Sequence, residues 1–107
     1  ALGVVRYPGP FAFGHETIAE VVAVGDDVPL APGTRVVVPF QLSCGRCLSC
    51  RRGWTNSCQA YPFGAAYGLK PTSKTEFGGA LADRMHVPFA DHMLLPLPST
   101  IDPVAAA

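Results

Sequence analysis

The sequence predicts a mainly β fold, in which short strands form a barrel or a sandwich. Eleven glycines and eleven prolines among 107 residues make a turn-rich chain, which favours short strands over long helices. Runs rich in β-branched residues stand between these turns at 18–24 and 35–38, as expected of strands. A chain of this length forms one domain at most. No apolar run approaches the ~20 residues that cross a bilayer, so we expect no membrane partner.

The first half of the chain alternates strands and turns. After a loop at 8–10, a strand is expected at 18–24, and it ends at the turn Gly25-Asp26-Asp27. A second turn at Pro32-Gly33 leads into a strand at 35–38, which enters the cysteine-rich loop. Residues 59–79 are scattered with Gly, Pro and Tyr and show no helical period, so a long loop is predicted there.

Two further strands and a helix are expected after residue 80. Residues 81–87 alternate roughly with period two and predict a half-buried strand. A turn at 90–91 precedes a fourth strand at 92–95, which Pro96 ends. Asp102 and Pro103 before an alanine run are typical of the N-cap and first residue of a helix. Because this helix stops after one turn, we expect the 107 residues to be a piece of a longer polypeptide.

All four cysteines lie within fifteen residues, in the pattern C-x2-C-x2-C-x7-C. Two-residue spacers let successive thiols turn around one ion, and the seven-residue spacer brings the fourth thiol back. Four clustered cysteines therefore predict a tetrahedral metal site. The predicted ligands are Cys44, Cys47, Cys50 and Cys58.

Four cysteines can serve other purposes than binding one zinc ion. Two disulfides would suit a secreted scaffold, but these cysteines share one loop and the N-terminus lacks a signal-peptide layout. A reducing intracellular, cytoplasmic location is therefore expected. An iron-sulfur carrier would match the first three cysteines, but not the seven-residue spacer or Gln59 in the place of proline. A closed set of four thiolates favours zinc that folds the loop.

The charges near the cysteines allow two interpretations. Arg46, Arg51 and Arg52 either offset the net charge of four thiolates on one divalent ion or are solvated surface groups. A nucleic-acid-binding zinc knuckle is the third alternative. It is disfavoured because Trp54 is the only aromatic residue beside these arginines and the formal net charge of the chain is zero. We therefore expect no nucleic-acid partner.

His15 and Glu16 follow Gly14 at the start of the first predicted strand. This pair could offer an imidazole and a carboxylate to a second metal, or could form a local hydrogen-bonded pair. His86 and His92 lie in the predicted hairpin and are expected to be surface or packing residues. The chain contains no G-x-G-x-x-G or Walker-type loop, so no phosphate-binding element is predicted.

The order of motifs resembles a known family. Gly14-His15-Glu16 is followed by a strand ending at Gly25, by Pro32-Gly33-x-Arg35-Val36, by the cysteine pattern and by Gly78-Gly79-Ala80-x-Ala82. This order is similar to that of the zinc-dependent alcohol dehydrogenases of the medium-chain dehydrogenase/reductase family. The resemblance runs from about Gly9 to Ala107.

The resemblance implies a GroES-like, partly open β-barrel with an inserted zinc-binding lobe at about 40–60. Residues 1–107 would be part of the catalytic domain, and the Rossmann cofactor domain would be absent. By the resemblance, the four cysteines hold a structural zinc, His15 is a ligand of the catalytic zinc, and Glu16 sits beside that zinc. Phe40 takes the place of an aromatic residue that lines the substrate pocket. The implied reaction transfers hydride between a small alcohol or carbonyl compound and NAD(P).

The sequence also departs from the family pattern. No cysteine precedes Cys44, so the first catalytic-zinc ligand has no counterpart, and the third ligand would lie beyond Ala107. Ala19 and Thr34 replace a usual glycine and aspartate. We therefore expect the chain alone to bind structural zinc but not NAD(P), and to turn over alcohol poorly or not at all. A non-enzymatic GroES-like zinc-binding interaction module is the alternative. Family members are commonly oligomers, so a homo-oligomer is a possible assembly.

Overall fold

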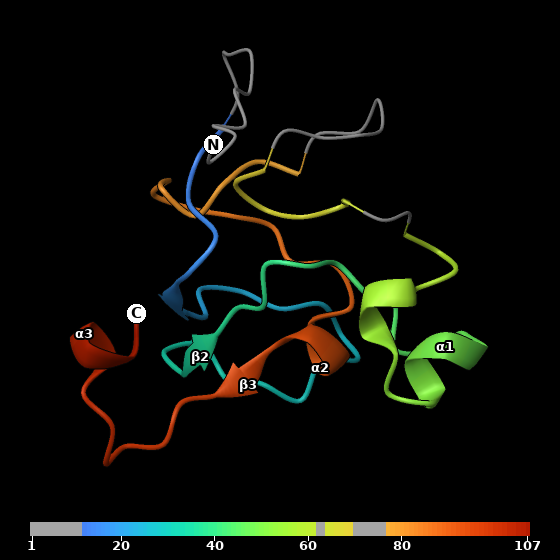
Figure 1. The fold of residues 1–107 in the computed structure, drawn as a ribbon. Helices are drawn as coiled ribbons and strands as arrows, with labels where there is room; N and C mark the ends of the chain where they lie inside the picture. Colours follow the sequence, from blue (N-terminus) through green and yellow to red (C-terminus); the bar gives the residue numbers. More distant parts are fainter. Residues whose placement is uncertain (1–11, 62–63, 70–76) are drawn as a thin grey trace, which may run out of the picture.

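The computed structural model describes residues 12–61, 64–69 and 77–107 (Figure 1). Within these residues three short strands form one antiparallel sheet in the order β1-β2-β3. The strands are β1 (Ile18–Glu20), β2 (Arg35–Val37) and β3 (Leu95–Pro96). The same part of the chain contains the short helices α1 (Leu48–Arg51), η1 (Thr55–Ser57), α2 (Ala90–Met93) and α3 (Pro103–Ala106).

The mainly β prediction is confirmed, and the first two predicted strands are present in shortened form. β1 pairs with β2 so that Ala19 lies opposite Val36 and Glu20 opposite Arg35. The carboxylate and the guanidinium of the last pair thus lie on neighbouring strands, a favourable cross-strand combination. The N–H of Val21 still donates to the carbonyl of Thr34 at 2.9 Å, and residues 22–27 beyond it are exposed.

The predicted turn at Pro32-Gly33 sets the register of this pair of strands. The N–H of Thr34 donates to the carbonyl of Ala31 at 3.1 Å, and Gly33 has φ 90°. A positive φ at the third position of a turn is costly for residues with a β-carbon, which explains the glycine. The turn at 25–27 is also confirmed, because the N–H of Val28 donates to the carbonyl of Gly25 at 3.2 Å.

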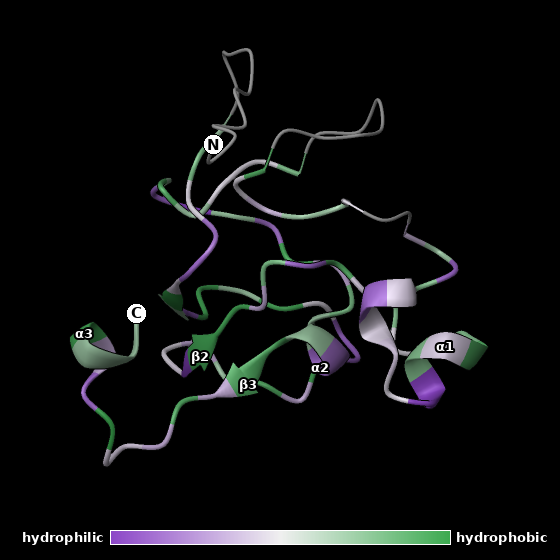
Figure 2. Ribbon diagram, viewed as in Figure 1, coloured by the Kyte–Doolittle hydropathy of each residue, from purple (hydrophilic) through white to green (hydrophobic). Residues whose placement is uncertain are grey.

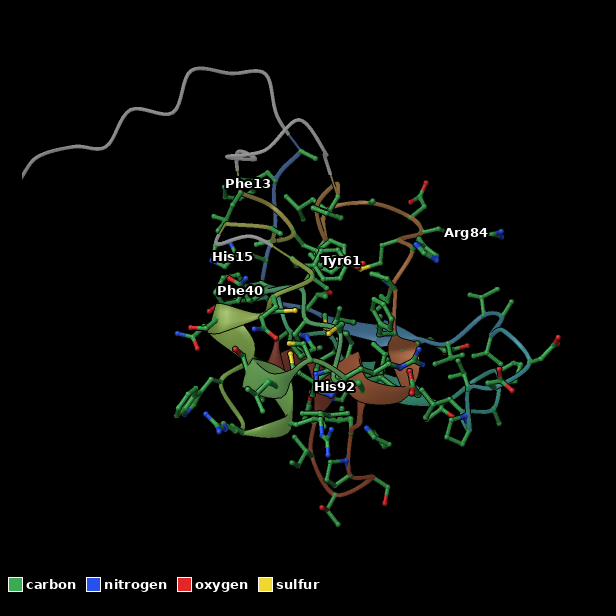
Figure 3. All side chains as sticks on the ribbon, turned by 90° about the vertical axis from the view of Figure 1, so that its right-hand side faces the viewer. Phe13, His15, Phe40, Tyr61, Arg84 and His92 are labelled. Carbon is green, nitrogen blue, oxygen red and sulfur yellow. The ribbon has the colours of Figure 1, made fainter. Side chains whose placement is uncertain are left out.

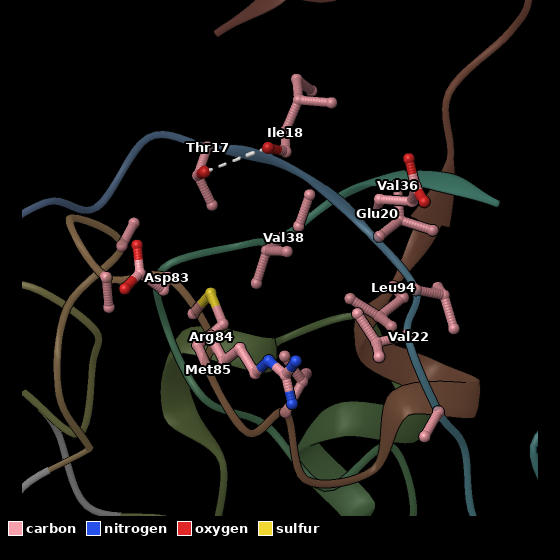
Figure 4. A pocket seen from close by; sticks show the side chains of 16 residues that line it. Thr17, Ile18, Glu20, Val22, Val36, Val38, Asp83, Arg84, Met85 and Leu94 are labelled. Carbon is pink, nitrogen blue, oxygen red and sulfur yellow. Dashed lines mark hydrogen bonds between the residues drawn. The ribbon is translucent and has the colours of Figure 1, made fainter. Parts of the chain in front are cut away.

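The strand predicted at 81–87 is wrong. The described structure has no regular element over these residues, although Met85 and Val87 pack against the core as the alternation indicated. Residues of this segment and of β1 together line a cavity of about 590 Å³ (Figure 4). A strand needs a hydrogen-bonded neighbour, and residues 82–87 make no backbone ladder bonds within the described part of the chain. Leu81 is instead 77% exposed.

The strand predicted at 92–95 is also wrong in its first half. Residues 90–93 form α2, since the N–H groups of His92 and Met93 both donate to the carbonyl of Phe89. The strand β3 begins only at Leu95 and continues through Pro96, which the sequence had placed at its end. Proline is tolerated there because β3 is an edge strand and needs no donor on its outer side.

The core lies between the sheet, the entrance to the cysteine loop and α2. Its fully buried side chains are Val36 from β2, Leu42 and Tyr67. Figure 2 shows hydrophobic residues along β2 and β3, whereas α1 carries both hydrophobic and hydrophilic residues. The remaining buried members of this core cluster are Val21, Val38, Ala65 and Met93.

The predicted helix start at Asp102 is confirmed. The carboxylate of Asp102 accepts hydrogen bonds from the backbone N–H groups of Val104 at 2.7 Å and of Ala105 at 3.3 Å. Pro103 takes the first helical position of α3, where a missing N–H costs nothing. Across the part of the chain that the structure describes, none of the helices combines the length and the apolar character needed to span a membrane.

Candidate metal centre and active-site cavity

The four cysteine thiols converge on one point. Their Sγ atoms all lie within 4.8 Å of one another. Zinc–sulfur bonds of about 2.3 Å in a tetrahedron would place the sulfurs about 3.8 Å apart. Small side-chain rotations therefore close this set around one ion, and the donor set is the all-thiolate kind that zinc prefers. The converging residues are Cys44, Cys47, Cys50 and Cys58.

Short helical turns hold the thiols in this arrangement. Cys47 is the N-cap of α1, and its Sγ accepts a hydrogen bond from the backbone N–H of Cys50. Both thiols thus lie at the start of one helical turn. Gly53, with φ 82°, ends the turn and donates its N–H to the carbonyl of Cys50 at 2.9 Å. The η1 helix then carries the chain back to Cys58. The sequence indicated an irregular lobe and did not predict these two helices.

Backbone N–H groups surround the thiols. In the described residues the Sγ of Cys44 and the Sγ of Cys47 each accept two backbone hydrogen bonds, and the Sγ of Cys58 accepts one from the N–H of Cys44. The donor–sulfur distances are 3.3 to 3.5 Å. Such donors stabilise a thiolate, since they place positive partial charge against the developing negative charge.

The thiols differ in acidity. The backbone N–H groups of Gln59 and Cys50 lower the pKa of Cys47 to about 6. Burial raises the pKa of Cys50 to about 12. Burial also acts to raise the pKa of Cys58, but the N–H of Cys44 and other backbone donors outweigh it and the pKa is lowered. A cation is therefore needed before all four groups become thiolates at neutral pH.

The arginines of the loop contact aromatic rings. The guanidinium of Arg46 lies 5.3 Å from the centre of the Phe89 ring, and that of Arg52 lies 5.6 Å from the centre of the Trp54 ring. Arg46 also lies 4.0 Å from an exposed carboxylate oxygen of Asp91, a separation at which surface pairs contribute little. The contacts that the thiols themselves accept come from backbone N–H groups.

His15, Glu16 and Phe40 share a second cavity. The rings of His15 and Phe40 are 5.9 Å apart between centroids and meet edge to face at 67°, and Figure 3 shows the two side chains next to each other. The cavity has a volume of about 300 Å³, and its other lining residues are Thr17, Val37, Val38, Pro39, Ala106 and Ala107. Both His15 and Glu16 are exposed. His15, Glu16 and Phe40, which the resemblance assigned to the catalytic-zinc site and the substrate pocket, thus line the same cavity.

Close backbone contacts hold the chain just before His15. The carbonyl of Gly14 accepts the N–H of Ala80 at 2.8 Å, and the carbonyl of Phe13 accepts the N–H of Leu81 at 3.1 Å. A β-carbon on Gly79 would overlap the carbonyl of Phe13, so only glycine fits there. Both glycine motifs, at Gly14 and at Gly78-Gly79, were recognised in the sequence. No sequence pattern indicated that their backbones are in contact.

A cavity beside β1 contains none of the candidate site residues. Its volume is about 590 Å³, and Figure 4 shows Val36, Val38 and Met85 among the side chains around it. Elsewhere in the described residues, no second group of three Cys, His, Asp or Glu side chains converges as the four thiols do. His15 and Glu16 therefore offer two ligands at most from this part of the chain.

Comparison with known proteins identifies the family of this fold. The model of the alcohol dehydrogenase GroES-like domain matches residues 2–99. The chain is 43% identical to D-altritol 5-dehydrogenase of Agrobacterium fabrum over 79 residues, which are 72% of this chain and 23% of that protein. The structure matches alcohol dehydrogenase TADH from Thermus sp. ATN1 with a TM-score of 0.76 and 38% identity, over 87% of this chain and 26% of that one.

A second solved structure gives the same result. Zinc-dependent alcohol dehydrogenase 2 from Streptococcus pneumonia matches with a TM-score of 0.71 and 25% identity, over 94% of this chain and 26% of that chain. This chain spans about a quarter of the length of the proteins it matches. The domain model covers nearly all of the chain, and the antiparallel sheet and the cysteine cluster agree with it. The chain therefore belongs to the alcohol dehydrogenase GroES-like domain family.

Proposed function

We propose that this chain is a partial catalytic domain of a zinc-dependent alcohol dehydrogenase and that it binds one structural zinc ion by itself. The observation that carries the zinc proposal is the convergence of four Sγ atoms within 4.8 Å. The backbone donors around those atoms support it, since they favour the thiolate form that zinc requires. All four cysteines are free thiols in the structure, which fits a reducing compartment such as the cytoplasm.

The four thiolates would complete the coordination of the ion and leave no position open for substrate. The role of this centre is then structural: it ties together α1, η1 and the start of the loop. Ligands for a second, catalytic zinc would be the imidazole of His15 and, beside it, the carboxylate of Glu16. When bound, the catalytic zinc supplies a Lewis acid that favours the alkoxide form of an alcohol or polarises a carbonyl group.

The chain's own residues would position a small alcohol or carbonyl compound in the cavity of about 300 Å³. The Phe40 ring stands against His15 and presents an apolar surface that excludes water from the reacting carbon. Glu16 holds negative charge near the imidazole, which favours binding of a cation there. NAD(P) would accept the hydride, and its binding would fall to a dinucleotide-binding domain outside these residues.

Metal analysis of the purified 107-residue chain tests the structural part. We expect about one zinc per chain and no visible absorption, whereas an iron-sulfur cluster would colour the protein. Cys50→Ser should lose the zinc, and Ser49→Ala, a neighbour in α1, should keep it. Zinc retention by the Cys50 variant would refute the assignment of the four thiols as one site.

The dehydrogenase proposal has its own test. The isolated chain should show no NAD(P)-dependent turnover of alcohols, and measurable turnover would contradict its description as an incomplete catalytic domain. The gene around it should encode a cysteine ahead of the Gly14-His15-Glu16 motif and a G-x-G-x-x-G loop after residue 107. A gene that lacks both would favour the non-enzymatic zinc-binding module instead.

A further inference from the structure

Ser43, the residue before the first cysteine, forms hydrogen bonds with two residues of α2. Ser43 is buried with 4% exposure, and its Oγ lies 2.9 Å from the Nε2 of His92. Its backbone N–H donates to the Sδ of Met93 at 3.3 Å, and its hydroxyl lies 3.6 Å from the same sulfur. A thioether is a weak acceptor, so His92 provides the strong partner of the Ser43 side chain.

The residue after the first thiol packs on the same histidine. Gly45 has φ 69°, and a β-carbon there would lie 2.5 Å from the Cγ of the His92 ring. Because real β-carbons essentially never come so close to another heavy atom, only glycine allows this contact. The imidazole of His92 therefore contacts both chain neighbours of Cys44, one by a hydrogen bond and the other by packing.

The residues on both sides of His92 pack against other parts of the fold. The next residue, Met93, is 2% exposed and belongs to the core, and β3 begins two residues later at Leu95 and pairs with β2. On the other side, Phe89 adopts a left-handed conformation with φ 50° and packs against the cysteine cluster. A residue with a β-carbon holds that conformation only where its surroundings enforce it. The imidazole is thus fixed from both ends of α2.

We propose that His92 is a positioning residue of the metal centre, which fixes the Sγ of Cys44 through the Ser43 hydroxyl and the Gly45 backbone. The proposal rests on zinc binding by the four thiols. Cys44 matters because its Sγ accepts the N–H groups of Arg46 and Cys47, so a shift of this residue disturbs the next ligand as well. Groups that orient metal ligands from outside the coordination shell commonly change affinity by about 10- to 100-fold.

Zinc affinity of the 107-residue chain, measured by competition with a chromophoric chelator, tests the proposal. His92→Ala should raise the zinc Kd about tenfold and speed chelator-driven release. His92→Gln should restore most of the affinity, because its amide can reach the Ser43 hydroxyl. His86→Ala is the matched control: His86 is exposed, and its backbone carbonyl, which the substitution keeps, accepts the hydrogen bond from the Tyr67 hydroxyl.

A second pair of measurements separates positioning from general stability. In the double variant Ser43→Ala/His92→Ala the loss of affinity should be less than the sum of the two single losses, since both remove one hydrogen bond. The absorption bands of the cobalt-substituted chain report ligand geometry directly, and they should shift in His92→Ala but not in His86→Ala. If His92→Ala does not fold, His92→Phe, which keeps the ring against Gly45, should still bind zinc more weakly than His92→Gln.

The outcomes distinguish this proposal from the one it rests on. A wild-type chain that binds no zinc would overturn both. A wild-type chain that binds zinc while His92→Ala matches His86→Ala in Kd, release rate and cobalt spectrum would overturn the positioning role alone.

Discussion

Gly68 packs directly on Gly14, so closely that a β-carbon at position 68 would overlap the Gly14 carbonyl group. The same carbonyl accepts the N–H of Ala80. The backbones of three chain segments, at Gly14, Gly68 and Ala80, are thus in direct contact immediately before His15. This contact joins the segment that precedes His15 and Glu16 to the residue after Tyr67, whose N–H donates to the carbonyl of Phe40 at 2.8 Å.

Gly68→Ala should destabilise the chain by more than its backbone conformation alone explains. Gly68 has φ 66° and Gly33 has φ 90°, but nothing lies within 4 Å of a β-carbon placed at Gly33. Gly33→Ala should therefore cost about 1 kcal/mol from the positive φ. Gly68→Ala should cost at least about 2 kcal/mol, since a clash is added. Urea unfolding measures both, and equal losses would contradict the close contact.

Tyr67 should make the fold sensitive to alkali. Burial, helped by the nearby Tyr61, raises the pKa of Tyr67 to about 12, whereas an unfolded tyrosine ionises near ~10. The folded state holds the hydroxyl proton of Tyr67 more tightly than the unfolded state does. The contribution of this group to the free energy of unfolding is therefore complete below pH ~10 and is lost as the pH rises to about 12. Unfolding free energy should fall by about 2 kcal/mol across this range.

Tyr67→Phe is the variant that checks this. It should lower stability by about 1 kcal/mol at neutral pH, because the hydroxyl no longer donates to the carbonyl of His86 at 2.7 Å. It should also remove most of the alkaline loss, and Tyr61→Phe should leave that loss in place. An unchanged alkaline profile in Tyr67→Phe would show that another group causes it.

Cys47 should be the most reactive thiol of the metal-free, reduced chain. Its pKa of about 6 makes it a thiolate at pH 7, while Cys50, with a pKa of about 12, stays protonated. Since the thiolate is the nucleophile, iodoacetamide at pH 7 should label Cys47 first and Cys50 last. Peptide mapping after short reaction times gives the order, and early labelling of Cys50 would contradict these environments.

Metal removal should destabilise the whole domain as well as the loop. The cysteine cluster packs against Tyr61 and Phe89, and these side chains also pack against the core. With zinc about 1,000-fold above its Kd, chelation should lower the unfolding free energy by about 4 kcal/mol. Cys58→Ser should lose this response and the exposed neighbour variant Ser57→Ala should keep it. Thermal unfolding with and without chelator measures the difference.

Phe40 should affect catalysis in the complete dehydrogenase that we propose. Its ring is 43% exposed and lines the cavity with His15, so Phe40→Ala removes apolar contact from the substrate. We expect kcat/KM for an apolar alcohol to fall about tenfold, the usual effect of losing a hydrophobic contact in a pocket. Phe13→Ala is the control, since Phe13 is exposed and does not line this cavity. Equal effects of the two variants on kcat/KM would contradict the assignment of Phe40 to the substrate pocket.

Several features could be predicted because neighbours in sequence create them. The cysteine spacing brings four thiols to one point, the Pro32-Gly33 pair makes its turn, and Asp102 caps α3. Each depends on groups within about fifteen residues of one another. The placement of His15, Glu16 and Phe40 in one cavity came only from the resemblance to a family, since single residues carry no such information.

The amino-acid sequence by itself determined the convergence of the four thiols, the turns and the β character of the chain, because all of these follow from local spacing and backbone preference. Only the tertiary structure decided that residues 81–87 would form no regular strand in the described part of the chain and that 90–93 would form a helix. It also decided that His92 would reach Ser43, 49 residues earlier in the chain, and that Gly68 would meet Gly14. Contacts at such separations depend on how the whole chain packs, and no local pattern records them.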